Sequence, residues 1–120
     1  MIFIGNDIVE IDRIKNIVKK FDNHFLDKIF SETEVKTVIQ RKNKIIHLSG
    51  KFSSKEAVKK ALCSAGLGSK IFPKDIEILN KENGEPYVRI IKLNKNNYKQ
   101  ISLSISHTSK YATSFALIDI

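Results

Sequence analysis

Apolar residues follow a helical spacing in the first half of the chain and alternate with polar residues in much of the second half. Residues 2–11 are rich in isoleucine and valine and alternate weakly, which is typical of a β-strand. Gly5 interrupts this segment, which indicates either a bulge or a close approach of another backbone. A helix is predicted directly afterwards, because the next apolar residues lie mostly three or four positions apart: Ile11, Ile14, Ile17, Val18 and Phe21.

Helical signals continue as far as residue 66. Residues 25–30 predict one or two turns, and the capping-box pair Ser31 and Glu34 predicts a helix that runs on through residue 39. The longest helical pattern covers about residues 44–65, and Gly66 and Gly68 end it. The single cysteine, Cys63, lies in the apolar part of this pattern, so we expect a buried core residue and no intrachain disulfide.

The second half of the chain is expected to consist mainly of strands. Residues 76–78 and 88–90 flank Asn83-Gly84, which is a strong signal for a β-hairpin turn. Residues 101–106 alternate isoleucine or leucine with serine, and residues 111–120 are mostly apolar, so each predicts a strand. This order predicts an α+β fold, in which one domain of residues 1–120 packs its helices on a mainly antiparallel sheet.

The composition is that of a globular protein with excess positive charge. Hydrophobic residues make up 42% of the chain, and 21 Lys and Arg against 13 Asp and Glu give a net charge of +8. This charge favours an anionic partner: nucleic acid, a membrane surface, a phosphorylated small molecule or an acidic protein. No apolar run approaches the ~20 residues that span a bilayer, and the first residues lack a signal-peptide pattern, so we expect a cytoplasmic protein.

Two carboxylates and a lysine are the first candidates for chemistry. Asp7 stands inside an apolar strand, where it could be a functional ligand or simply the partner of a nearby lysine. Glu56 and Lys60 are four positions apart on one helix face and could form an ordinary surface salt bridge. Magnesium is usually held by one or two carboxylates plus substrate phosphates, so the three residues together also suit a diphosphate site.

His107 follows the serine-rich strand and is the other candidate. A histidine at a strand end can bind phosphate or move a proton, and a hydrogen-bonded structural histidine is also compatible with the sequence. His24 and His47 have no supporting neighbours and are expected to be structural.

Four segments resemble, in the same order, the motifs of the holo-acyl-carrier-protein synthase family, the short bacterial 4'-phosphopantetheinyl transferases. They span nearly the whole chain, so together they are far more specific than any one alone. The segments are Gly5-Asn6-Asp7 followed by Arg13, Phe52-Ser53-Ser54-Lys55-Glu56-Ala57 with Lys60, Asn83-Gly84-Glu85-Pro86-Tyr87, and Ser104-Ile105-Ser106-His107.

The resemblance implies a 4'-phosphopantetheinyl transferase fold and a reaction in support of fatty acid biosynthesis. The 4'-phosphopantetheine of coenzyme A would pass to a serine of apo acyl carrier protein, with Mg2+ required and 3',5'-ADP released. Asp7 and Glu56 would hold the metal, and Lys60 would contact the phosphate and steady the leaving nucleotide. Arg13 would meet the acidic carrier protein, and neighbouring subunits of a homotrimer would share each site. Further residues would line the coenzyme site: Lys51, Gly66, Gly68, Gly84, Pro86 and His107.

Two positions depart from the commonest family pattern, and the proton acceptor stays open. Lys51 stands where many relatives carry arginine, which keeps the charge but loses the bidentate geometry. Glu85 stands where a basic residue is common, which weakens the case for a 3'-phosphate contact there. Asp7 acting through a metal-bound water is the first choice to accept the serine proton, and Glu56 or a free water are the alternatives.

Three other functions stay open on the sequence alone. A nucleic-acid-binding domain fits the charge, but the chain has no tryptophan and no stripe of aromatic residues among basic ones, so we expect no nucleic acid partner. A magnesium-dependent phosphodiesterase would use the same carboxylates and transfer phosphate to water. A non-catalytic trimeric scaffold would have no need of Asp7, Glu56 and Lys60.

Overall fold

The computed structural model describes residues 1–120 and contains the elements in the predicted order. Strand β1 (Ile2–Glu10) leads directly into α1 (Ile11–Phe21), and the other helices are α2 (Asn23–Ile29), α3 (Glu32–Ile39) and α4 (Lys44–Ser64). A short 3-10 helix, Pro73–Asp75, precedes β2 (Ile76–Asn80), β3 (Pro86–Ile90), β4 (Gln100–His107) and β5 (Tyr111–Asp119). The α+β class expected from the sequence is confirmed.

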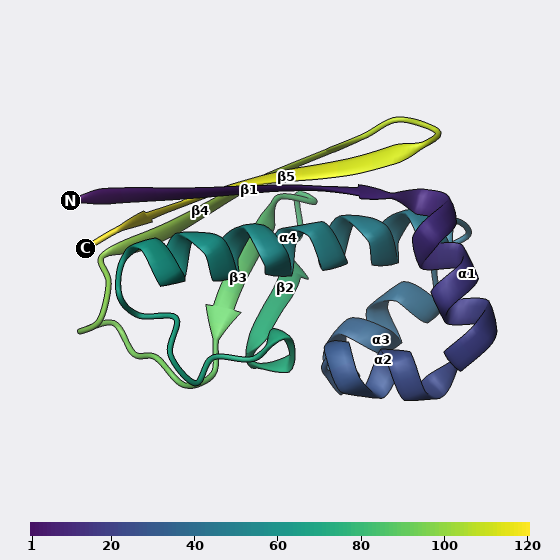
Figure 1. Cartoon of the computed structure of the whole chain (residues 1–120), viewed down its shortest axis with the longest axis horizontal. Coiled ribbons are helices and arrows are strands. Elements are labelled where there is room, and N and C mark those ends of the chain that lie inside the picture. Colours follow the sequence, from purple (N-terminus) through teal and green to yellow (C-terminus); the bar gives the residue numbers. More distant parts are fainter.

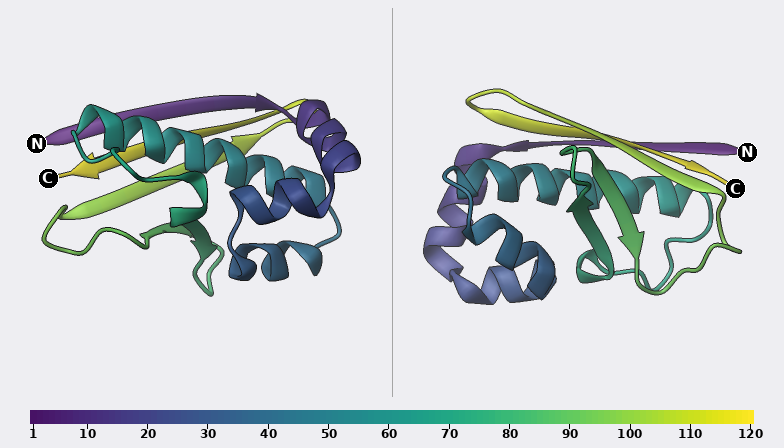
Figure 2. Two further views of the ribbon diagram at one scale, coloured as in Figure 1. Left: turned by 60° about the horizontal axis from the view of Figure 1, so that its bottom comes forward. Right: turned by 180° about the vertical axis from the view of Figure 1, so that it is seen from behind.

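Helix α4 runs through the centre of the molecule, with elements packed on two sides of it (Figure 1). A three-stranded sheet in the order β1-β5-β4 covers one side, helices α1–α3 lie on the other, and the β2–β3 hairpin passes beside α4 (Figures 1 and 2). Every strand pair is antiparallel, as predicted. The strands form two sheets rather than one, because β3 packs beside β4 without a ladder of hydrogen bonds between them.

Small residues allow α4 to lie very close to the sheet. A Cβ atom on Gly5 would lie only 2.1 Å from the carbonyl oxygen of Ala57, so no larger residue fits at position 5 without a shift of backbone. The pairing of β1 with β5 continues without a break from Ile2–Asp119 to Glu10–Tyr111. The close approach at Gly5 is therefore confirmed, and the alternative of a bulge is wrong.

The apolar core consists of two clusters, one at each end of α4. The larger joins α4 to β2, β3 and β5, and the smaller joins α1, α3 and the start of α4 to the ends of β1 and β5. Cys63 belongs to neither: it is exposed, so the prediction of a buried cysteine is wrong. Cys63 follows the buried Leu62. Successive side chains of an α-helix point about 100° apart, so the side chain of Cys63 lies off the buried face.

A buried ion pair ties α4 to α3 and β2. Lys55 and Glu34 are 1% and 0% exposed, and their Nζ and Oε1 atoms are 2.6 Å apart. Glu34 also accepts hydrogen bonds from the backbone N–H groups of Ser31 and Ile78, both at 3.0 Å, and Lys55 donates to carbonyls just before and at the start of β2. The capping box predicted at Ser31 is confirmed, and its glutamate also neutralises a lysine in the core.

Candidate active site

Strand β1 and helix α4 bring the three principal candidates together. Lys60 Nζ lies 3.2 Å from Asp7 Oδ1 and donates a hydrogen bond to the carbonyl of Asn6 at 3.0 Å. Glu56 precedes Lys60 by one helical turn and so lies on the same face of α4. The surface salt bridge between Glu56 and Lys60 that the sequence allowed does not form, because Lys60 pairs with Asp7 across the two elements.

The electrostatics of Glu56 suit a cation. Burial and the negative charge of Asp7 raise the pKa of Glu56, and the positive charges of Lys60 and Lys59 oppose that rise only in part. Glu56 makes no hydrogen bond or ion pair of its own. Two carboxylates that repel each other gain from a divalent cation, and carboxylate oxygens are ligands that Mg2+ prefers. The donor set therefore fits this metal.

The chain itself supplies only part of a metal coordination sphere. No group of three or more His, Cys, Asp or Glu residues lies close enough to hold an ion. A pair of carboxylates is nevertheless what magnesium commonly takes from a protein when the substrate brings phosphate oxygens. The arrangement around Asp7 and Glu56 is thus suited to a metal that binds together with a phosphorylated substrate.

Buried serines hold β5 against α4 beside this carboxylate pair. Ser114 stands opposite Asp7 in the β1–β5 register, and its hydroxyl lies 2.5 Å from that of Ser53 and 3.0 Å from that of Ser54. Thr113 donates its hydroxyl to the carbonyl of Asp7 at 2.9 Å. This role was not predicted from the sequence, although Ser53 and Ser54 lie close to Glu56 in one of the motifs and a serine in the apolar stretch 111–120 needs a partner.

A second group of candidates lines a separate pocket of about 90 Å3. His107 lies at the exposed end of β4, and Lys51 is buried and donates its Nζ to the carbonyl of Ile78 in β2. Burial and the positive charges of Arg41, Lys51 and His107 lower the pKa of His47, which also lines this pocket.

His47 was expected to be structural, and its place beside His107 was missed. The signal was its spacing, because His47 precedes Lys51 by four positions and so shares its helix face. The pocket therefore combines groups able to carry positive charge, which suits a phosphate or another small anion.

The two groups of residues face different sides of α4. Lys51 and Glu56 are five positions apart, which corresponds to about 140° around a helix. Lys51 points to β2, where Ile78 accepts its hydrogen bond, whereas Glu56 shares the side of Lys60, which reaches β1. Within one chain, the structure brings Asp7, Glu56 and Lys60 together and places Lys51 and His107 in another pocket.

The remaining predicted coenzyme-binding residues occupy two turns. Gly66 (φ +76°) ends α4 and is followed by Gly68, which is buried against Cys63. Gly84 (φ +88°) forms the β2–β3 turn, and Pro86 begins β3.

The charge of Glu85 in the hairpin turn is compensated nearby. Its carboxylate lies 3.2 Å from Lys81 Nζ in the same turn. The carboxylate introduced at position 85 is therefore itself paired with a cation. A basic group is still present there, supplied from a different position.

Two exposed surfaces lie outside these pockets. Arg13 in α1 lines a shallow groove with Lys20 and Phe21, and Lys20 Nζ lies 5.3 Å from the centre of the exposed Phe21 ring. The face of the three-stranded sheet that points away from α4 carries exposed apolar side chains: Ile2, Ile4, Ile8, Tyr111 and Phe115. No helix combines the length and the apolar character needed to cross a membrane.

Comparison with known proteins places these features in context. Residues 3–116 match the family model described as the 4'-phosphopantetheinyl transferase superfamily. The chain is 44% identical to holo-[acyl-carrier-protein] synthase from Protochlamydia amoebophila, covering 95% of this chain and 94% of the relative, and 46% identical to the protein of that name from Caldanaerobacter subterraneus, covering 97% and 93%.

Solved structures give the same result. Holo-[acyl-carrier-protein] synthase from Neisseria meningitidis superimposes with a TM-score of 0.86 at 27% identity, over the full length of both chains. The Helicobacter pylori protein in complex with coenzyme A gives a TM-score of 0.81 at 32% identity, covering 97% of this chain and 99% of that one.

Proposed function

Because this chain belongs to the 4'-phosphopantetheinyl transferase superfamily, we propose that it acts as a holo-acyl-carrier-protein synthase. It transfers the 4'-phosphopantetheine group of coenzyme A to a serine of an apo acyl carrier protein, releasing 3',5'-ADP. The observation that carries this proposal is the meeting of Asp7, Glu56 and Lys60 between β1 and α4, at the positions of two family motifs. The predicted cytoplasmic location stays a prediction.

The carboxylate pair and Lys60 would prepare the diphosphate for attack. Asp7 and Glu56 would hold Mg2+, which supplies positive charge to the phosphate oxygens when bound. Lys60 adds a second positive charge that is 56% exposed, so its ammonium is free to reach a phosphate oxygen and to steady the leaving nucleotide. Asp7 acting through a water stays our first choice as acceptor of the serine proton, because a carboxylate that ligates a metal is itself a weak base.

We further propose a homotrimer whose active sites are shared between subunits. Lys51 and His107 lie on a different side of α4 from Glu56, so one coenzyme A could meet both groups only if a second subunit supplied one of them. The exposed apolar face with Ile4, Ile8 and Phe115 supports such an assembly, because contiguous apolar patches of this kind usually mark an interface. Gly66, Gly68, Gly84 and Pro86 would then shape the coenzyme site from two turns.

The groove around Arg13 is the proposed docking surface for the acidic carrier protein. Arg13 and Lys20 supply positive charge beside the acidic Glu10 and Asp12, and the exposed ring of Phe21 adds an apolar surface next to Lys20. Complementary charge mainly accelerates encounter, so the association rate should fall as salt screens the exposed pairs. Arg13→Glu should slow association at low salt and remove much of the salt dependence, with turnover at saturating carrier protein less affected.

The first test is intact mass spectrometry of an apo acyl carrier protein incubated with this chain, coenzyme A and Mg2+. We expect a gain of one phosphopantetheine group, and its loss with EDTA, Asp7→Ala or Glu56→Ala. Without the metal, the transition state would lose several kcal/mol of charge stabilisation, which corresponds to a decrease of roughly a thousandfold in the rate of transfer. A gain that survived both substitutions would overturn the assignment of the site, and nucleotide hydrolysis without a modified carrier would favour the phosphodiesterase.

The shared site has its own test in mixed assemblies. Glu56→Ala and His107→Glu should each be inactive alone. Mixed and reassembled in equal amounts, they should regain roughly a quarter of wild-type activity if each site draws on two neighbouring subunits. Recovery confined to the level of the separate variants would contradict the sharing while leaving the transferase itself intact.

A further inference from the structure

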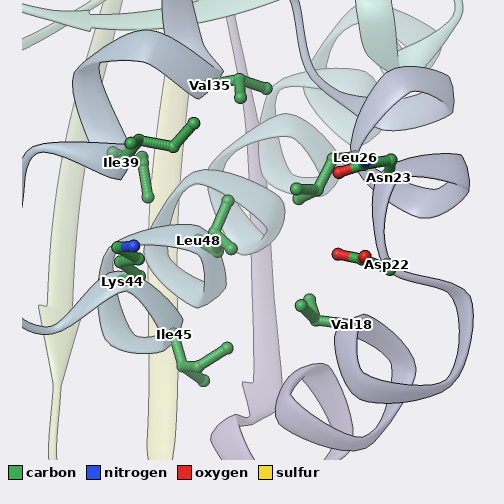
Figure 3. Close-up of a pocket in the computed structure, with 10 residues that line it drawn as sticks. Val18, Asp22, Asn23, Leu26, Val35, Ile39, Lys44, Ile45 and Leu48 are labelled. Atoms are coloured by element: carbon green, nitrogen blue, oxygen red, sulfur yellow. The ribbon is translucent and has the colours of Figure 1, made fainter.

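A largely apolar cavity lies among the four helices, apart from both groups of candidate residues (Figure 3). Its volume is about 330 Å3, and seven of its ten lining residues are hydrophobic. This volume is at the lower end of the ~300–1,000 Å3 of small-molecule sites. Leu48 in its wall precedes Glu56 by eight residues of α4, a distance of about 12 Å along the helix axis.

Each helix contributes one part of the wall. Val18 comes from α1, Leu26 from α2, Val35 from α3, and Ile45 and Leu48 from α4, and Figure 3 shows these side chains around a common space. The cavity opens to solvent, so these apolar side chains face water instead of other protein atoms. An apolar chain of the right size would cover them and supply the missing dispersion contacts.

The charged residues at the rim of the cavity indicate which polar head group such a ligand would carry. Lys44 lines the cavity at the start of α4 and forms no ion pair, and Asp22 lies across the opening from it (Figure 3). The chain next to these two residues is strongly basic, with Lys19 and Lys20 before Asp22 and two further cations, at positions 41 and 42, before Lys44. Segments 19–22 and 41–44, which contribute Asp22 and Lys44 to the lining, carry five cations and one acid, which favours an anionic head group on the Lys44 side.

We propose that this cavity binds a medium-chain fatty acid, with its chain between Val18, Leu26 and Leu48 and its carboxylate paired with Lys44. The ligand would contact α1 and α4 at once and so stabilise the position of the helix that carries Arg13. The site needs neither coenzyme A nor a carrier protein, so it goes beyond the proposed transferase function and can be tested without it.

The test is calorimetric titration of the full chain with sodium decanoate, with thermal melting in parallel. We expect saturable binding at one site per chain and a higher melting temperature. Replacing Lys44 by glutamine should weaken decanoate binding by roughly fivefold, as expected for a partly exposed ion pair, and leave 1-decanol binding unchanged. Decyltrimethylammonium should bind more weakly than decanoate.

A cavity-filling variant and a matched control locate the site. Val35→Phe should abolish binding, and Ile91→Phe, which enlarges an exposed residue far from the cavity, should retain it. Val18→Phe replaces Val35→Phe if circular dichroism shows that the first variant does not fold. The proposal is overturned if decanoate does not saturate below its aggregation concentration, if binding survives the filled cavity, or if the three head groups bind equally.

Discussion

Lys55 and Glu56 are consecutive residues of α4, and their surroundings are opposite. Lys55 is 1% exposed, and its charge is matched by Glu34 and by backbone carbonyls. Glu56 is half-buried and has no partner of its own, and its pKa is raised by burial and by Asp7. The charge of Lys55 is matched within the fold, whereas the charge of Glu56 has no partner. An unmatched, half-buried charge is expected of a group that binds a substrate or metal.

The largest effect should come from breaking the satisfied pair. Lys55→Met leaves Glu34 charged and buried, so we expect the free energy of unfolding to fall by about 3–5 kcal/mol. Chemical denaturation followed by circular dichroism measures this. The double variant Glu34→Leu with Lys55→Met should regain part of the loss, because it removes both charges together. A single variant as stable as the wild type would mean that the pair contributes nothing to the fold.

Lys60→Ala should lower activity strongly and change stability little. Its ammonium is partly exposed and pairs with Asp7 at 3.2 Å, so stability should change by less than about 0.5 kcal/mol. Transfer should slow by roughly a hundredfold or more, because a charge aimed at the reacting phosphate is lost. Single-turnover rates and melting curves on the same samples test both parts. An unchanged rate would show that Lys60 serves only to hold Asp7.

Gly5→Ala probes the contact that brings the two sides of the site together. The new Cβ would collide with the backbone carbonyl of Ala57, so β1 and α4 must separate. Overpacking of this kind destabilises by about 1–3 kcal/mol. Because Asp7 follows on the same strand, activity should fall as well, and Mg2+ dependence should shift to higher concentration. For the stability readout alone, the matched control is Gly66→Asn, where a Cβ meets nothing within 4 Å and asparagine tolerates the positive φ.

The smallest effect should be a gain in stability on removing a functional charge. Burial raises the pKa of Glu56 above its unfolded value, so the ionised carboxylate destabilises the fold at neutral pH. Glu56→Gln should therefore melt slightly higher than the wild type at pH 7. The gain should shrink as pH falls through the raised pKa and vanish below the ordinary glutamate value of about 4.3. Melting curves from pH 3.5 to 7.5 would show it, and a constant difference would contradict it.

The spacing of apolar residues predicted the helices and strands well, because each element buries one face and apolar side chains recur along that face at the period of the element. The limits of α4 and the turn at Gly84 follow from local signals that the chain carries within a few residues. The burial of Lys55 could not be read in this way, since lysine is ordinarily exposed and its partner Glu34 lies in another helix. Cys63 was wrongly placed for a related reason, because one step around a helix separates buried from exposed.

The residues of the candidate site were predicted better than their arrangement in space. Asp7, Glu56 and Lys60 meet as the resemblance implied. No local pattern indicates that Lys51 points away from them, and the spacing of His47 from Lys51 does not show that His107 lies nearby. These facts depend on which side of α4 each strand occupies. That choice is made by tertiary packing between segments far apart in the chain.

The pairing of β1 with β5 has a consequence for how the protein is made. Ile2 lies beside Asp119, so the strand that carries Asp7 finds its only hydrogen-bonded neighbour more than a hundred residues later in synthesis. Closing so long a loop is entropically unfavourable and slow, and until then β1 presents an unpaired apolar edge. The strand that carries Asp7 is thus synthesised about a hundred residues before its partner strand, and during that interval its unpaired edge is open to aggregation.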